Sequence, residues 1–302
     1  MISEYKLKEG ILLDCVQPQK EDLEKISKQL RIDVESLRGK LDFSSRPKVT
    51  RKGDFSIISF SAPYRKEKQE KTTTIYIIYS KKVVIVIRKH EVVSLKTLQT
   101  WSKKGKNSEV LAIILEKVLA EYFERMELID EEIESIEGEI VLKPTKKSVQ
   151  KIFELKKQLI FFHKAFSADR EVLLSITRDS SLGLTKQEIE NFQEVYSETV
   201  QLIDLEEIYR DILTNNLDMY ISSISNNLNS IMKTLTIIMS FFMAPALIAG
   251  IYGMNFRQSP TNMPELYWNY GYFWALGLMV LTIVGLYIFF KKKGWIEKRD
   301  LT

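Results

Sequence analysis

The residue with the clearest potential for ion chemistry is Asn255, which follows Gly253 and Met254 at the end of a long apolar segment. Mg²⁺ holds its water tightly, so a selective site should accept the hydrated ion through neutral oxygens that hydrogen-bond to that water. The Asn255 amide offers such an oxygen, and glycine lets the backbone turn and expose its carbonyls. Carboxylates could bind too tightly, because conduction requires weak sites. Gly253, Met254 and Asn255 are therefore candidates for an ion-selectivity filter.

The segment before Asn255 predicts an axial pore, because one asparagine is too little for a hydrated ion and a symmetric ring is enough. At 100° per residue, a helix over this segment presents a stripe within an arc of about 80°. We call it the pore stripe: Asn229, Met232, Thr236, Met239 and Met243, with Gly250 on the same face and Leu235 at its edge. Repeated around an axis, it forms a hydrophobic constriction that gates by dewetting. The alternatives are core packing for the methionines and a helix C-cap for Asn255.

Two uncharged runs, 234–256 and 270–290, must position these residues. Each has the roughly 20 residues that cross a hydrocarbon core of about 30 Å. Lys291, Lys292 and Lys293 follow the second run, so the positive-inside rule predicts a cytoplasmic C-terminus. The N-terminus has no apolar signal region and is also expected in the cytoplasm. The sequence thus predicts a two-pass protein of the plasma membrane, with residues 253–269 outside, spans at about 233–252 and 270–290, and a basic tail at 291–302.

The rest of the chain predicts an α+β cytoplasmic domain, a small sheet with helices, followed by long helices. Residues 1–106 combine helical spacing over 20–39 with strand-like stretches at 55–60, 74–79 and 83–87. Residues 107–185 predict an antiparallel helical hairpin, acidic in its first arm and basic at the start of its second. Thr185 and Glu188 form a capping box that opens a helix over 186–252, roughly 100 Å long. This helix is a stalk that continues into the first span.

The filter segment resembles the CorA family of magnesium channels. Tyr252-Gly253-Met254-Asn255-Phe256 closes the first span, and Met263-Pro264-Glu265-Leu266 precedes the second, as in that family. The resemblance implies a homopentameric funnel in which Asn255 rings the outer mouth and the first span lines the pore. It implies magnesium influx, with cobalt or nickel as further passengers. Two alternatives stay open: a zinc transporter of the same superfamily, favoured less because Met254 suits the magnesium branch, and a membrane-anchored scaffold or signalling subunit without a pore.

The stalk also suggests regulation by the transported ion. Residues 187–232 carry nine acidic side chains and one base, Arg210. Carboxylates of neighbouring subunits repel when bare and attract across a bound Mg²⁺, which would hold the pore shut. The resemblance singles out Glu194 as the regulatory metal ligand, with Glu67 or Glu70 of the next subunit as its partner. The remaining acids of the stalk are expected to form a solvated face.

Other function classes find little support. Cys15 is the single cysteine, so neither an intrachain disulfide nor a cysteine zinc cluster can form. His90 and His163 are isolated and are expected to be surface or packing residues. No glycine-rich nucleotide loop, metalloprotease motif or nucleophile elbow occurs, so we expect no enzyme. The net charge of +4 conceals opposed acidic and basic blocks and indicates no nucleic-acid partner.

Overall fold

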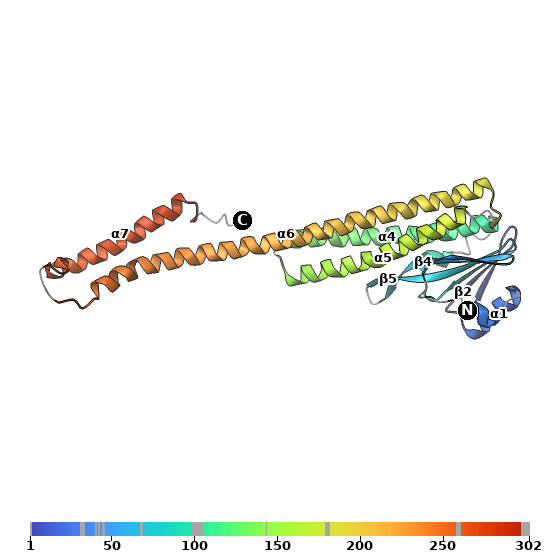
Figure 1. Ribbon diagram of the computed structural model, residues 1–302, viewed down its shortest axis with the longest axis horizontal. Helices are drawn as coiled ribbons and strands as arrows, with labels where there is room; N and C mark the ends of the chain where they lie inside the picture. The colour runs from blue at the N-terminus through green and yellow to red at the C-terminus, as the bar shows by residue number, and fades with distance from the viewer. Residues whose placement is uncertain are drawn as a thin grey trace. The chain divides into compact units, whose positions relative to one another are not determined.

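The computed structural model describes residues 2–30, 34–39, 41, 43, 46–66, 69–97, 105–142, 144–178, 182–257 and 261–296. The chain divides into two compact units, Met1–Tyr220 and Ile221–Thr302. Helix α6 (Lys186–Tyr252) belongs to both, and its bounds are those that the sequence predicts (Figure 1). The first unit contains a mixed sheet covered by helices, and the second contains two apolar helices.

The first unit is organised by a six-stranded sheet in the order β1-β2-β6-β5-β4-β3. Strands β2 and β6 are parallel, with Leu13 opposite Ile85, and every other neighbouring pair is antiparallel. The strands are β1 (Ile2–Lys6), β2 (Ile11–Val16), β3 (Val49–Lys52), β4 (Phe55–Lys66), β5 (Gln69–Tyr79) and β6 (Val83–Arg88). The β6 sequence Val-Val-Ile-Val-Ile-Arg is buried throughout, as expected for a central strand covered on both faces.

The sheet is larger than the three strands that the sequence pattern predicts. Strands β1, β2 and β3 were missed, and β4 and β5 extend as a long hairpin in which Arg65 pairs with Glu70. Pro63 lies within β4, although proline cannot donate to a sheet ladder. Strand β3 pairs only with residues 55–58 of β4, so Pro63 lies where β4 has no strand on that side. An edge position tolerates proline.

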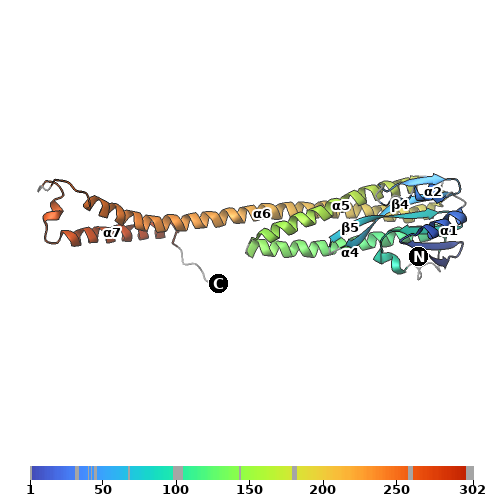
Figure 2. The same cartoon turned by 90° about the horizontal axis from the view of Figure 1, so that it is seen from below.

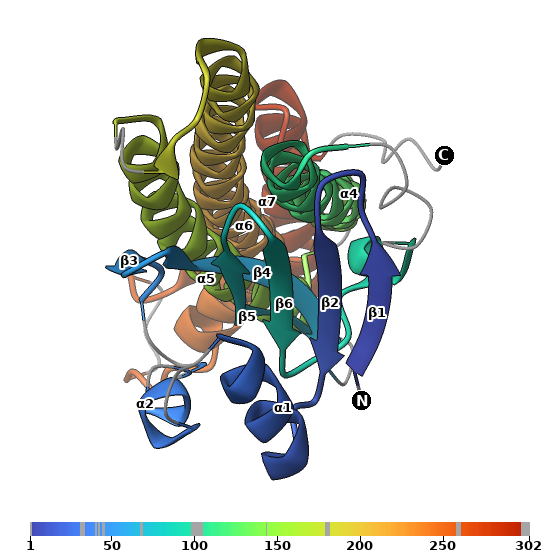
Figure 3. The same cartoon turned by 90° about the vertical axis from the view of Figure 1, so that its right-hand side faces the viewer.

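Helices cover both faces of the sheet (Figure 3). On one face lie α1 (Lys20–Leu30) and α2 (Val34–Arg38), which pack Ile26 and Leu37 against Cys15 and Tyr76. The sequence predicts helical spacing over 20–39, and the structure has two helices there. On the other face lie α4 (Asn107–Leu142), α5 (Lys146–Arg178) and the first part of α6. The short helix η1 (Val93–Thr97) connects the sheet toward α4.

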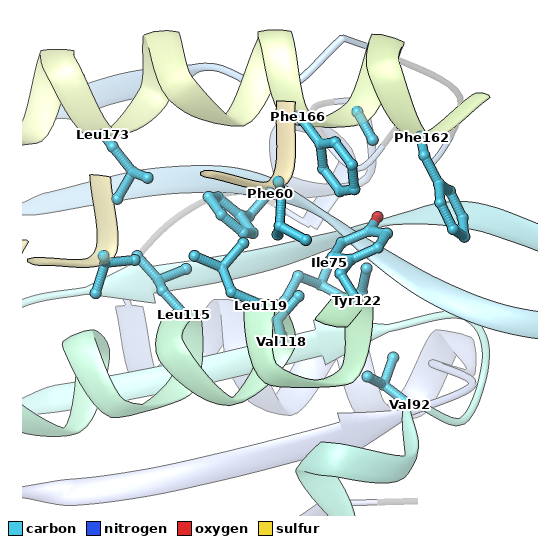
Figure 4. Packing of buried hydrophobic residues seen from close by; sticks show 14 of the residues in the cluster. Phe60, Ile75, Val92, Leu115, Val118, Leu119, Tyr122, Phe162, Phe166 and Leu173 are labelled. Carbon is cyan, nitrogen blue, oxygen red and sulfur yellow. The ribbon is translucent and has the colours of Figure 1, made fainter. Parts of the chain in front are cut away.

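The main core of the first unit lies between the sheet and the long helices (Figure 4). Tyr122 of α4 is fully buried and meets Phe162 and Phe166 of α5 edge to face, at ring-centroid distances of 5.3 and 4.8 Å. Phe60 and Ile75 supply the sheet side of this cluster. Buried aromatic pairs in this geometry stabilise a core beyond the area they bury.

Local polar contacts fix the ends of the long helices, as the sequence predicts. At the start of α6, the Thr185 N–H donates to Glu188 Oε2 (2.7 Å) and the Glu188 N–H donates to Thr185 Oγ1 (3.3 Å), which is the expected capping box. Across the α4–α5 turn, Lys151 Nζ donates to Glu139 Oε1 at 2.9 Å. The acidic and basic arms of the hairpin therefore make at least one charge contact.

The second unit contains the end of α6, the short helix η3 (Pro264–Tyr267) and α7 (Gly271–Lys292), which returns antiparallel to α6 (Figures 1 and 2). Among the described residues, α6 and α7 are the two helices long and apolar enough to cross a membrane. Pro245 lies inside α6, and the helix continues past it to Tyr252.

Candidate ion-permeation site

The predicted filter residues lie immediately beyond the end of α6. The helix ends at Tyr252, the Gly253 N–H donates to the Ala249 carbonyl at 2.9 Å, and the Met254 N–H donates to the Ile251 carbonyl at 3.2 Å. Gly253, Met254 and Asn255 are all exposed. The side chain of Asn255 is therefore carried at the tip of a rigid apolar helix, where several copies could form a ring.

The backbone at the filter argues against the simple C-cap alternative. Asparagine and glycine favour helix ends because they accept a left-handed conformation. Among the described residues, positive φ angles occur only at Gln17, Met263 and three glycines, none of which belongs to the filter. Asn255 is thus not used as a left-handed cap. Gly253 likewise has no positive φ.

The loop after the filter is anchored to its neighbours. Asn262 Nδ2 donates to the Arg257 carbonyl at 3.0 Å, and Met263, with φ 48°, precedes η3. Gly271 begins α7 so close to η3 that a Cβ there would lie 2.0 Å from the Glu265 carbonyl oxygen. Only glycine fits at this approach. The Met-Pro-Glu-Leu segment is therefore held against the start of the second span.

The whole pore stripe is exposed within one chain. Met232 and Met243, at its two ends, are 59% and 63% exposed. The other members are also exposed: Asn229, Leu235, Thr236, Met239 and Gly250. The Thr236 hydroxyl donates to the Met232 carbonyl at 2.8 Å, so its proton is satisfied inside the helix. The stripe thus presents a mainly apolar surface with a polar residue, Asn229, at its start.

Helix α7 covers a different face of α6. Phe241 contacts Phe290 of α7 at a ring-centroid distance of 6.0 Å, and Ile248 is buried. At 100° per residue, Phe241 and Ile248 lie about 140–160° from the centre of the pore stripe. The stripe therefore faces away from the second span, and no described residue of the second unit fills that face.

The regulatory candidate Glu194 lies in the first unit, on the wall of an acidic cavity between α4 and α6. The cavity has a volume of about 360 Å³ and includes Glu109, Glu116 and Glu198. Burial, with the charges of Glu116 and Glu194, raises the pKa of Glu198, whereas Lys117 lowers it. In the described part of one chain, no group of three or more His, Cys, Asp or Glu side chains is arranged to hold a metal ion. The cavity concentrates negative charge without forming a complete site.

The two suggested partners of Glu194 are Glu67 and Glu70, and only Glu70 belongs to the described residues. Glu67 lies outside the described residues. Glu70 is buried, and its carboxylate is 3.2 Å from Arg125 Nη1 and 3.7 Å from Arg65 Nε. Burial raises the pKa of Glu70, and the two arginines oppose that rise. Glu70 is therefore already neutralised by cations of its own chain.

The structure adds residues that the sequence reasoning passed over. Glu109 and Glu116 are seven residues apart on α4, and Glu194 and Glu198 are four apart on α6; both spacings place side chains on one helix face and were available as a signal. The two histidines, predicted to be surface or packing residues, each contact a side chain of the first unit. His163 Nδ1 is 2.7 Å from Glu206 Oε2, and His90 stacks on Tyr64 at 4.2 Å.

Comparison with known proteins gives a consistent result. A sequence model of CorA-like Mg²⁺ transporter proteins matches residues 8–292. The chain is 34% identical over 304 residues to the cobalt/magnesium transport protein CorA of Methanocaldococcus jannaschii. This alignment covers 97% of this chain and 92% of that protein. It is 40% identical over 194 residues to the protein of the same name from Thermotoga maritima, covering 64% and 54% of the two chains.

A solved structure agrees along nearly the whole chain. The complete CorA magnesium transporter from Methanocaldococcus jannaschii superposes with a TM-score of 0.84 at 31% sequence identity, over 95% of this chain and 92% of that one. The likeness covers the sheet unit, the long helix and the C-terminal apolar helices together.

Proposed function

Because the chain belongs to the CorA-like Mg²⁺ transporter family, we propose that it is a membrane-resident divalent cation channel that mediates Mg²⁺ influx. Cobalt is a second expected passenger, since the similar archaeal and Thermotoga proteins are named for cobalt and magnesium transport. Nickel is a third by its similar charge and size. The proposed role is passive transport, without a catalytic step.

One observation carries the proposal: a rigid apolar helix has a stripe turned away from the second span and ends directly at exposed Gly253, Met254 and Asn255. The Asn255 amides would hydrogen-bond to the water shell of the ion, and the methionine rings below would form the constriction. A scaffold without a pore accounts for two spans and a cytoplasmic unit, but it gives this stripe and this amide no role.

The pore requires several copies of the chain, and we propose a homopentameric funnel. Met232, Met239 and Met243 remain exposed in a single chain, although a cation path must be closed on all sides. A symmetric ring of α6 helices encloses the path and brings the Asn255 side chains together at one end. The lipid bilayer covers the outward faces of α6 and α7.

The proposed orientation places both chain ends in the cytoplasm. Lys291 and Lys292 form the last turn of α7 and Lys293 caps it, which favours the cytoplasmic side. The filter and the η3 loop then face outside. Lys298 and Arg299, which strengthen this bias in the sequence, lie outside the described residues.

We further propose that cytoplasmic Mg²⁺ regulates the channel through Glu194. Its position on the wall of the acidic cavity supports this, because four carboxylates there raise the local concentration of divalent cations. The missing ligands would come from a neighbouring subunit. Glu70 is a poor partner, since Arg125 and Arg65 already occupy it, whereas Glu67 stays a candidate. Glu194 and the pore stripe share one uninterrupted helix, so a shift at one can reach the other.

The decisive experiment is metal flux into liposomes that contain the pure protein. We expect Mg²⁺ uptake down its gradient, slower Co²⁺ and Ni²⁺ uptake and little Zn²⁺ uptake, with no need for an energy source. Protein-free liposomes are the control. Zn²⁺ uptake that exceeds Mg²⁺ uptake would support the zinc transporter instead, and no uptake from correctly assembled oligomers would support the scaffold.

A further inference from the structure

Lys233 places a positive charge next to the proposed ion path. It is the sole charged side chain in residues 219–256 and directly follows Met232 of the pore stripe. At 100° per residue, it lies about 40° beyond the edge of the stripe at Asn229. A lysine has a flexible four-carbon stem, so an unrestrained Lys233 could swing its ammonium toward the path. A ring of such ammonium groups would repel cations, because rings of lysine favour anions.

In the structure, this ammonium group does not point freely toward the path. It contacts the C-terminal end of the second span. Lys233 Nζ donates to the carbonyl oxygen of Gly294 at 3.2 Å, and Lys233 is half-buried. Gly294 follows the last residues of α7, and Phe290 of α7 packs against Phe241 of α6. The contact joins residues 61 positions apart.

A well-formed helix end presents that carbonyl. Gly294 has φ 66°, its N–H donates to the Lys291 carbonyl (3.1 Å), and the Trp295 N–H donates to the Phe290 carbonyl (2.9 Å). This pair of bonds is a Schellman motif, in which glycine takes the left-handed position. The Trp295 ring also stacks on Phe290 at 5.5 Å. The turn therefore has a defined geometry that depends on Gly294.

Electrostatics explains why the ammonium stays there. The C-terminal end of a helix carries partial negative charge on its free carbonyls, which attract a cation. Lys291, Lys292 and Lys293 surround the same end with positive charge and oppose Lys233. The attraction therefore relies on close contact with one oriented carbonyl, which a different turn geometry would remove.

We propose that the Gly294 turn is a latch that holds the Lys233 ammonium out of the ion path, which makes Gly294 a positioning residue for conduction. The proposal rests on the proposed function, since it matters only if the pore stripe conducts cations. When the turn is intact, the Lys233 charge does not affect permeation. When the turn is broken, five freed ammonium groups repel the ion beside the Met232 constriction.

The test is a pair of substitutions that separates charge from folding. Valine is strained at positive φ, so Gly294→Val should break the turn. Its expected effect in liposomes is a loss of Mg²⁺ flux of about tenfold or more, equivalent to roughly 1.4 kcal/mol of added barrier. Gly285→Val is the matched control on α7, because a Cβ at Gly285 meets no atom within 4 Å. Lys233→Met alone should keep or raise the flux.

The double variant Lys233→Met/Gly294→Val carries the decisive result. If the freed charge blocks the path, the double variant regains the flux of the parent. If the valine merely damages the turn, the double variant remains as slow as Gly294→Val, and the latch is wrong. The latch is also wrong if Gly294→Val conducts like the parent, or if Lys233→Met itself abolishes flux.

A second readout does not depend on conduction. Amine-reactive labelling of the full-length protein in detergent, quantified by mass spectrometry at Lys233, should rise several-fold in Gly294→Val and not in Gly285→Val. Equal labelling in the two variants would overturn the latch. If the parent protein carries no divalent cation in liposomes, the proposed function fails, while this labelling still decides whether Gly294 restrains Lys233.

Discussion

Asp14 of β2 and Arg88 of β6 form a two-point ion pair inside the first unit. Arg88 Nη2 is 2.7 Å from Asp14 Oδ2, and Arg88 Nε donates to Asp14 Oδ1 at 3.0 Å. The side chains of Arg88 and Asp14 are 4% and 7% exposed. Arg88 Nη1 also donates to the Val92 carbonyl. The pair fastens the parallel strands β2 and β6, on which the order of the sheet depends.

Removing one partner of this pair should be costly. Asp14→Ala leaves the Arg88 charge buried and unpaired, which typically costs about 3–5 kcal/mol. Glu91→Ala is the control, because the Glu91–Lys96 pair is exposed and solvent screening leaves such a pair with little effect on stability. Labelling of the single cysteine, Cys15, reports opening of this unit in the full-length chain, since burial raises its pKa to about 11. If Cys15 becomes half-labelled at the same denaturant concentration in the two variants, the Asp14–Arg88 ion pair contributes little to the stability of this unit.

The filter assignment predicts that Asn255→Ala abolishes Mg²⁺ uptake without loss of assembly. The residue is exposed beyond the helix end, so its removal leaves no cavity in a core. The exposed α6 residue Asn215, replaced by alanine in parallel, should leave flux unchanged. Uptake is measured in liposomes and the oligomer by size-exclusion chromatography with light scattering. Normal uptake by Asn255→Ala would end the filter assignment.

The methionines of the pore stripe should limit leak. Met232→Gly or Met243→Ala widens an apolar constriction and lowers the dewetting barrier, so flux at high internal Mg²⁺ should increase. Met219→Ala is the control: Met219 is an exposed methionine of α6 that lies off the stripe. Unchanged or reduced leak in assembled Met232→Gly and Met243→Ala would mean that these side chains only pack.

Regulation through Glu194 predicts a change in Mg²⁺-dependent protection. Glu194→Gln removes a charge from the acidic cavity, so higher Mg²⁺ should be needed to protect the cytoplasmic unit from protease. Glu190→Gln is the control, since Glu190 is exposed on the same helix and does not line the cavity. Stripping the metal with a chelator should make parent and variant equally sensitive. Coincident Mg²⁺ titrations of parent and Glu194→Gln would leave Glu194 as a solvated residue.

The α4–α5 turn should be sensitive to acid. Hydrogen bonds from Lys151 and Ser148 hold the pKa of Glu139 below its ordinary value of 4.5. A lowered folded-state pKa stabilises the fold above the unfolded-state pKa, and this contribution is lost as pH falls through the folded-state pKa. The difference in Tm between parent and Glu139→Gln should therefore shrink below about pH 4.5. Glu132→Gln, at an exposed position, should show no such trend; a constant difference for Glu139→Gln would contradict the role of its ionised form.

The sequence alone determined the features that depend on local pattern. The capping box at Thr185 and Glu188, the absence of glycine between Gly183 and Gly250 and the apolar runs fix helix α6 and the two candidate spans, since helical hydrogen bonds and hydropathy act over neighbouring residues. The filter motif is likewise local. The sheet was only partly predictable, because charged residues and Pro63 obscured the ends of its strands.

Only the tertiary structure decided which distant residues share an environment. It pairs Asp14 with Arg88 across 74 positions, Ser61 with Asp169 across 108 and Lys233 with Gly294 across 61. It also assigns Glu70 to Arg125 and thereby removes an apparently open carboxylate. No spacing rule predicts such contacts, because they form when separate elements pack together, and packing depends on the complementarity of whole surfaces rather than on the periodicity of one segment.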